Sequence, residues 1–287
     1  MSAAISLSEP RLANTAHGAG QVIYGVDANG VTRLRDLYQS DSVRVLFPTP
    51  PRGEIPAAAF VTTSGGLVGG DVLELTAQAD EDAAVLCYPQ AAEKIYRSTG
   101  ATCQIMVSLR AASGAWLEWL PQETIMFDGA RLIRRTVAEI TPGGRLLAGE
   151  MTVLGRAAMG ETLCHGLLRD DWSVRRDGRL LWADSFCLDG DIADIVAHPA
   201  GLAGASALAT AVYVADDAGE FLATARDLLD TAPASVRVGA TLVNYILVVR
   251  FMAADSQSLR HAFGEFWAGF RQAAAGLPAA LPRLWHI

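Results

Sequence analysis

Apolar and polar residues alternate in short runs through the first two-thirds of the chain, the pattern of strands with one buried face. It predicts an opening strand pair between residues 20 and 31, then strands at 72–78, 83–88, 103–109, 115–120, 132–140 and 145–154, and a hairpin over 172–188. Turn signals separate these runs, notably Asn29-Gly30 and Asp177-Gly178. The proline-rich residues 48–56 are expected to form a surface connection. Residues 90–97 are expected to form at most a turn or two of helix.

The pattern changes after about residue 204. Residues 207–214 are predicted to be a strand, and 237–251 a strand pair or one long bent strand. Helical spacing of apolar residues predicts a helix at 220–231 and a longer one from the N-cap Asp255 to Gly276. The apolar face of the longer helix, around Phe263, Phe266 and Phe270, is expected to pack on a sheet.

We therefore predict a mainly β (α+β) fold, in which antiparallel sheets stack as a sandwich-like arrangement with two helices near the C-terminus. The chain contains no evident linker, so residues 1–287 are predicted to form a single domain. Its β-rich part covers residues 20–200, and its α+β C-terminal part covers 205–287.

A glycine-rich segment, residues 62–71, precedes one predicted strand and ends in Asp71. Glycine pairs allow positive φ angles or the close approach of another group. A phosphate-binding loop should lead into a helix, whereas a strand is predicted here, so nucleotide binding is disfavoured. A structural turn that presents Asp71 is the simpler interpretation.

Composition and charge restrict the function. The 287 residues are 51% hydrophobic and carry a net charge of −8 without a Lys/Arg cluster, which argues against nucleic-acid binding. The four cysteines form no C-x-x-C pair, so neither a zinc knuckle nor a disulfide framework is indicated. Because we find no secretory signal and no apolar run long enough for a membrane span, a cytoplasmic protein is expected.

Several polar residues lie in apolar surroundings, and Glu150, inside a strongly apolar strand, is the clearest case. A buried carboxylate is costly unless it is paired, hydrogen-bonded or hydrated. It could form a salt bridge with Lys94, Arg97 or Arg156, or it could line a wet cavity. No nucleophile constellation and no zinc-site spacing is present.

Cys164 and His165 are the only adjacent thiol and imidazole. Neighbouring residues of a strand point to opposite faces, so both could bind one ion only at a bend or bulge. A small buried cysteine without a metal is the alternative.

The sequence also carries motifs that span nearly the whole chain. They are Leu-Tyr-Gln-Ser at 37–40, Thr-Ser-Gly-Gly-Leu-Val-Gly-Gly-Asp at 63–71, Gln-Ala-Ala-Glu-Lys-Ile-Tyr-Arg-Ser at 90–98, Leu-Glu-Trp-Leu-Pro-Gln-Glu-Thr-Ile at 117–125, Phe-Asp-Gly-Ala at 127–130, Leu-Gly-Arg at 154–156 with Gly-Glu at 160–161, and Leu-Pro-Arg-Leu-Trp at 281–285. In this combination and order, the sequence resembles the urease accessory protein family UreD, also named UreH.

The resemblance implies a non-enzymatic scaffold and metallochaperone with no tightly bound cofactor, which handles Ni²⁺ transiently through an internal polar channel. The implied partners are apo-urease, the helical accessory protein UreF and the nickel-carrying GTPase UreG, within a dimeric accessory complex. No nucleic acid or membrane partner is implied.

Carried over by position, the resemblance makes Asp71, Glu150 and Asp184 the candidate channel-lining residues for nickel. Asp184 lies where the family more usually has Glu-Arg. Supporting positions are Lys94, Arg97, Glu123, Asp128, Arg156, Glu161 and His165. Glu93 lies at a position where members of the family often have Thr or Ser, so any role of a hydroxyl group at that position would not apply to this chain.

Two other functions stay open at this stage. A hydrolase could use Asp71 and Glu150 as paired carboxylates, which would require both in one open pocket. A purely structural adaptor would lock the carboxylates in salt bridges.

Overall fold

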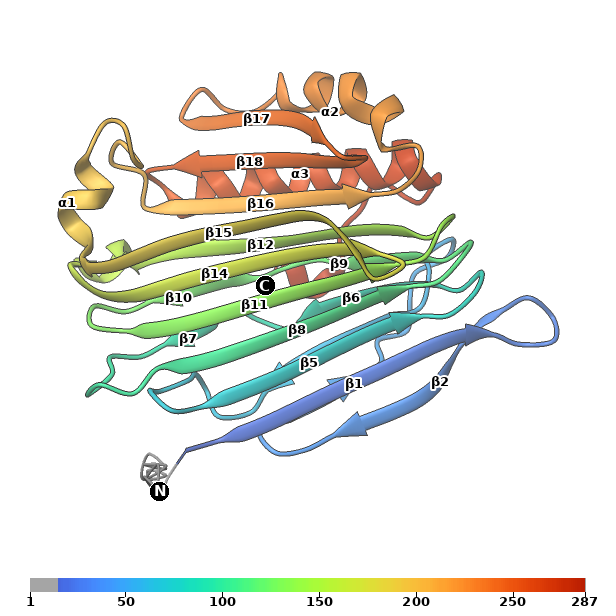
Figure 1. Cartoon of the computed structure of the whole chain (residues 1–287), viewed down its shortest axis with the longest axis horizontal. Helices are drawn as coiled ribbons and strands as arrows, with labels where there is room; N and C mark the ends of the chain where they lie inside the picture. The colour runs from blue at the N-terminus through green and yellow to red at the C-terminus, as the bar shows by residue number, and fades with distance from the viewer. Residues whose placement is uncertain (1–14, 287) are drawn as a thin grey trace, which may run out of the picture.

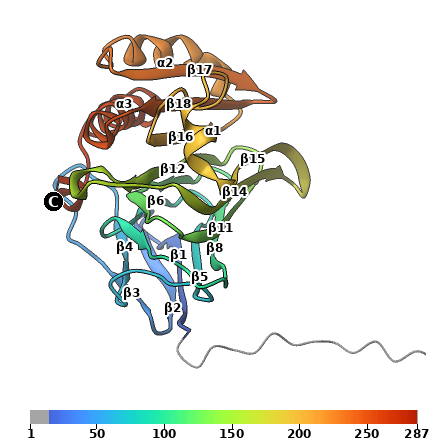
Figure 2. The ribbon, with the colours of Figure 1, turned by 90° about the vertical axis from the view of Figure 1, so that its left-hand side faces the viewer.

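The computed structural model describes residues 15–286 as two stacked β-sheets with the two C-terminal helices against one of them (Figures 1 and 2). The first sheet has the order β15 (Arg179–Asp191), β14 (His165–Arg176), β11 (Arg131–Ile140), β8 (Cys103–Ala111), β5 (Val72–Ala79), β1 (His17–Val26) and β2 (Thr32–Gln39). The second has the order β17 (Val236–Val243), β18 (Ile246–Ala253), β16 (Ala207–Val214), β12 (Arg145–Arg156), β9 (Trp116–Trp119), β6 (Ala84–Pro89), β4 (Ala57–Thr62) and β3 (Val43–Leu46).

Short strands complete the second sheet, and helices flank both sheets. Strand β10 (Glu123–Met126) pairs with β12 and with β7 (Glu93–Ile95), and β13 (Glu161–Thr162) pairs with β12. The helices are α1 (Ile192–Ala197), α2 (Leu222–Leu229) and α3 (Ser256–Ala275), with 3₁₀ turns at Ala157–Met159, Ala218–Phe221 and Arg283–His286. Figure 1 shows α2 and α3 at the end of the stack formed by β16, β17 and β18.

The prediction of a mainly β fold is confirmed, but that of antiparallel sheets is wrong for the middle of both sheets. There the chain alternates between the sheets: β5, β8 and β11 lie in the first, and β6, β9 and β12 in the second. Each return to a sheet runs in the same direction, so β5, β8 and β11 pair in parallel, with Leu73 opposite Ile105 and Ile105 opposite Arg134. A strand of the other sheet supplies the crossover that parallel pairing needs, which gives a solenoid-like stack.

Local turn chemistry agrees with the structure. Asp177 and Gly178 join β14 to β15 with φ angles of 48° and 75°, as a type I′ turn requires. The helical turn predicted at residues 90–97 is wrong, because β7 lies there. Its Lys94 carbonyl accepts a hydrogen bond from the Leu67 amide at 2.8 Å. Pairing with the glycine-rich segment and with β10 therefore overrides the local preference.

The long C-terminal helix is confirmed. Asp255 caps it by accepting a hydrogen bond from the Ser258 amide at 2.7 Å, and Gly276 ends it with a left-handed φ of 66°. Its Phe263 is fully buried and meets Phe251 of β18 edge-on, with 5.4 Å between ring centroids. The apolar face of α3 thus packs on the second sheet, as expected.

Two apolar layers result, one between the sheets and one between the second sheet and the helices. Strand β12 contributes to both, because alternate side chains point to opposite faces. Leu146 and Ala148 belong to the layer between the sheets, whereas Leu147 and Met151 belong to the helix side. Glu150 has the parity of Ala148, so its carboxylate points between the sheets. Within residues 15–286, no helix has both the length and the apolarity needed to cross a bilayer.

Candidate functional site

An arginine and two carboxylates meet in the layer between the sheets. Arg134 of β11 and Glu150 of β12 face each other, with 2.8 Å between Nη1 and Oε2. Their side chains are 3% and 8% exposed. Asp170 of β14 accepts from Nη2 of the same guanidinium at 2.6 Å and from Nε at 3.2 Å. One buried cation thus bridges two carboxylates from different sheets.

Threonine hydroxyls complete this cluster. Arg134 donates to Thr124 Oγ1 at 2.8 Å and to Thr152 Oγ1 at 3.2 Å, and Thr136 donates to Glu150 Oε1 at 3.3 Å. Burial opposes ionisation of Arg134, but its two carboxylate partners outweigh this and raise its pKa. Burial raises the pKa of Glu150 to about 7, although the charge of Arg134 acts in the opposite direction.

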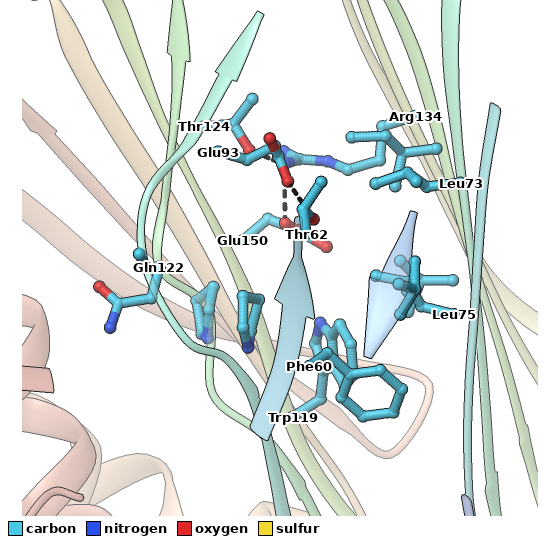
Figure 3. Close-up of a pocket in the computed structure, with 16 residues that line it drawn as sticks. Phe60, Thr62, Leu73, Leu75, Glu93, Trp119, Gln122, Thr124, Arg134 and Glu150 are labelled. Atoms are coloured by element: carbon cyan, nitrogen blue, oxygen red, sulfur yellow. Dashed lines mark hydrogen bonds and ion pairs between the residues drawn. The ribbon is translucent and has the colours of Figure 1, made fainter. Parts of the chain in front are cut away.

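Two cavities adjoin the cluster, and Glu150 lines both. The inner cavity, of about 50 Å³, is bounded on its polar side by Thr62, Glu93, Thr124, Arg134 and Glu150 (Figure 3). The outer cavity, of about 240 Å³, is bounded on its polar side by Glu150, Thr152, Asp170, Asp184, Thr210 and Arg250. The outer cavity has room for several water molecules beside polar groups that could bind them.

The inner cavity holds a further carboxylate, that of Glu93. Thr62 donates to its Oε2 at 2.6 Å. Burial raises the pKa of Glu93, while the hydrogen bond from Thr62 opposes the rise. Figure 3 shows Glu93 and Thr62 close to Thr124 and Arg134, with Leu73, Leu75 and Phe60 forming an apolar side.

The polar residues that line the two cavities form a row from Glu93 through Arg134 and Glu150, and Asp184 lies at its other end. Its Oδ2 accepts from Arg250 Nη2 at 2.6 Å, and Arg250 also donates to Thr210 at 2.8 Å. The side chains of Asp184 and Arg250 are 30% and 45% exposed, so this end of the outer cavity reaches the surface. Of the three carboxylates predicted to line a channel, Glu150 and Asp184 share the outer cavity.

Asp71 has a different environment. It is 3% exposed, and its carboxylate accepts from the Ala16 amide at 2.7 Å and the Val68 amide at 2.8 Å. These bonds close the glycine-rich turn, in agreement with the structural interpretation. Asp71 lines neither cavity, so it does not share an open pocket with Glu150.

Five supporting residues, Arg97, Asp128, Arg156, Glu161 and His165, form a separate group near the end of β12. Asp128 accepts from the Cys164 and His165 amides at 2.8 and 3.0 Å, which lowers its pKa, and from Arg97 at 3.3 Å. Glu161 pairs with Arg156, which lowers the pKa of Glu161, and accepts from the Asp128 amide at 2.8 Å. The contacts recorded for Cys164 and His165 here are thus made by their backbone.

Two further positions complete the predicted set. Glu123 pairs with Arg260 of α3, and the Lys94 side chain is exposed. Within residues 15–286 no group of three or more His, Cys, Asp or Glu side chains is arranged to hold a metal ion. Any cation in the cavities would therefore meet carboxylate and hydroxyl oxygens rather than a preformed cluster of that kind.

A second buried ion network lies on the helix side of the second sheet. Glu118 is fully buried and accepts from Trp116 at 2.8 Å, Trp267 at 2.9 Å and Arg271 Nε at 3.1 Å. Arg271 also pairs with Glu54, at 2.7 and 2.9 Å. This network joins α3 to the proline-rich connection.

Sequence reasoning missed Arg134 and Asp170. It offered Lys94, Arg97 or Arg156 as possible salt-bridge partners of Glu150, and these are wrong, because the partner is Arg134. Arg134 shares its parity in β11 with the buried Leu132 and Ala138, so the strand alternation could have identified it as inward-facing. The second carboxylate, Asp170, depends on the parallel register of β11 and β14, which sequence reasoning did not predict.

Comparisons with known proteins agree on one family. The model of the family described as "UreD urease accessory protein" matches residues 16–286. This chain belongs to the UreD family. A relative from Magnetococcus marinus, "Urease accessory protein UreD", is 46% identical over 265 residues, 91% of each chain. A UreD relative from Methylorubrum populi is 42% identical over 91% of this chain and 86% of its own length. Another, from Rhodopseudomonas palustris, is 41% identical over 98% of this chain and 94% of its own length.

Proposed function

We propose that this UreD chain is a non-enzymatic urease accessory protein that passes Ni²⁺ towards the urease active site through the space between its sheets. The observation that supports this most is the polar row in an otherwise apolar layer. Glu150 lines both cavities, and the row continues to Asp184, which is partly exposed. A buried polar row of this kind costs stability unless its groups are paired, hydrogen-bonded or hydrated.

The ligand chemistry suits a cargo ion rather than a resident one. Carboxylate and hydroxyl oxygens bind Ni²⁺ more weakly than clusters of imidazole or thiolate, and transfer requires release. In this scheme Glu150 and Asp184 hold the hydrated ion in turn. Asp71 supports the route indirectly, by fixing the glycine-rich turn that pairs with β7, the strand of Glu93.

The proposal includes the partners that a delivery route needs. We place apo-urease at one end and the helical accessory protein UreF, with the nickel-carrying GTPase UreG, at the other, within a dimeric assembly in the cytoplasm. The family membership and the urease accessory names of the relatives support this.

The test is nickel loading of urease in cells that express the urease operon with either the native chain or Glu150→Gln. We expect the nickel content per urease to fall severalfold while pull-down of the accessory complex is unchanged. Glu74→Gln is the matched control, because Glu74 is exposed and lines neither cavity. Full nickel content with Glu150→Gln would refute the route.

A structural adaptor without a nickel path is the second candidate. The pairing of Glu150 with Arg134 and of Asp184 with Arg250 favours it. It predicts that Glu150→Gln either leaves urease fully loaded or fails through loss of folding or of pull-down.

A further inference from the structure

The guanidinium of Arg134 lies at the boundary between the two cavities. Its Nη1 bonds Thr124 and Glu150, which line the inner cavity, whereas its Nη2 bonds Thr152 and Asp170, which line the outer one. Arg134 itself lines the inner cavity, and its partner Glu150 is shared by both, so this ion pair lies where the two cavities come together.

Each nitrogen of this guanidinium has an acceptor. Nε and Nη2 bond Asp170, and Nη1 bonds Glu150, so the cation offsets half of the charge that the two carboxylates carry when both are ionised. An arginine side chain stays protonated in proteins, so this charge cannot be lost by titration. A second cation that binds both carboxylates at once competes with the guanidinium for the oxygens Glu150 Oε2 and Asp170 Oδ2, which accept its hydrogen bonds.

We propose that Arg134 is a gate that a divalent cation opens by displacing the guanidinium from Glu150 and Asp170, and that closes again as the ion leaves. This rests on the proposed nickel route and adds its control element. A monovalent cation offers the two carboxylates no more charge than the guanidinium already does, so the gate selects divalent ions. The returning guanidinium also prevents the ion from being trapped.

The chain contains a matched control in Arg271. Like Arg134, it is buried between two carboxylates, here Glu54 and Glu118. It lines neither cavity. Loss of Arg271 therefore also leaves buried carboxylates without their cation, but away from the proposed route.

The experiment measures binding of NiCl₂ to the purified full-length chain by equilibrium dialysis, for the native protein, Arg134→Met, Arg134→Lys and Arg271→Met. Circular dichroism and thermal unfolding establish that each variant is folded. We expect Arg134→Met to bind Ni²⁺ at least about tenfold more tightly than the native chain, because two carboxylates lose their resident cation. Arg134→Lys, which keeps the charge, and Arg271→Met should stay within about threefold of the native chain.

Equal affinity of folded Arg134→Met and the native chain would overturn the gate, and so would an equal gain in Arg271→Met. If Arg134→Met does not fold, Arg134→Lys decides: the gate requires that it still bind weakly, and tight binding would refute it. The proposed route is tested separately by the nickel content of urease with Glu150→Gln. If Arg134→Met binds Ni²⁺ more tightly but urease is fully loaded with nickel in the Glu150→Gln strain, the route alone is refuted. If Arg134→Met binds Ni²⁺ no more tightly but urease is poorly loaded in the Glu150→Gln strain, the gate alone is refuted.

Discussion

Removal of Arg271 is expected to destabilise the protein strongly at neutral and alkaline pH. Arg271→Met leaves Glu118, which is fully buried, without its cation, although two indole N–H groups still donate to it. Breaking a buried ion pair by removing one partner costs about 3–5 kcal/mol. For a chain of this size, that corresponds to a fall in Tm of roughly 6–10 °C.

The loss should depend on pH in a defined direction. Burial raises the pKa of Glu118, and Arg271 opposes this rise. A group with a raised folded pKa favours the fold below its unfolded pKa, about 4.3, and loses that contribution as the pH rises through the folded value. Without Arg271 the folded pKa of Glu118 rises further, so the variant should lose less stability at pH 5 than at pH 8.

The assay is thermal and urea unfolding at pH 5 and pH 8 for the native chain, Arg271→Met and the double variant Arg271→Met/Glu118→Gln. Neutralising Glu118 in the double variant should recover about 1–3 kcal/mol at pH 8. Arg226→Met, at an exposed arginine of α2, is the control and should stay within about 0.5 kcal/mol. A loss below about 1 kcal/mol at pH 8, or an equal loss at both pH values, would refute the reasoning.

Three further predictions concern the core, the glycine-rich turn and the polar cluster. Phe263→Ala should cost about 3–5 kcal/mol in urea unfolding, whereas the exposed Glu265→Ala on the same helix should cost under about 0.5; similar losses would contradict the packing of α3. Gly66→Ala should lower Tm far more than Gly65→Ala, although both glycines have a positive φ. A Cβ at position 66 would lie 2.5 Å from an aromatic carbon, whereas one at position 65 would meet nothing within 4 Å. Equal shifts in Tm would contradict this. Because the pKa of Glu150 is raised to about 7, its ionisation disfavours the fold as the pH rises from about 4.3 to 7. Glu150→Gln should therefore flatten the pH dependence of the unfolding free energy in that range. An unchanged profile would show that Glu150 is not the titrating group.

Local chemistry made part of the fold predictable. The N-cap at Asp255 and the turn at Asp177-Gly178 rest on contacts within a few residues, and both are found in the structure. The direction of strand pairing rests on which sheet each strand joins, and alternation within one strand carries no information on that. Parallel pairing of the central strands therefore could not be predicted from local pattern.

The candidate site divides in the same way. Glu150 could be identified from its apolar neighbours, because a carboxylate in such a strand needs an explanation. Arg134 and Asp170 come from two other strands, and only the register between strands places them beside it. Asp71 belongs to a distinctive motif, but its hydrogen bonds are those of a turn.

The alternation of the chain between the two sheets has a consequence for the order of folding during synthesis. Each central strand pairs with one about 30 residues earlier, as Ile105 does with Leu73 and Arg134 with Ile105. Each new coil of the chain can therefore add to the previous one as it is synthesised. Arg271 is made 217 residues after Glu54, and until α3 arrives both Glu54 and Glu118 lack their cation. The last helix thus closes a structure whose sheets can assemble before it, and it covers Glu118 and supplies the cation of Glu118 in the same step. In a chain that stops before α3, that face of the second sheet would lie open to water.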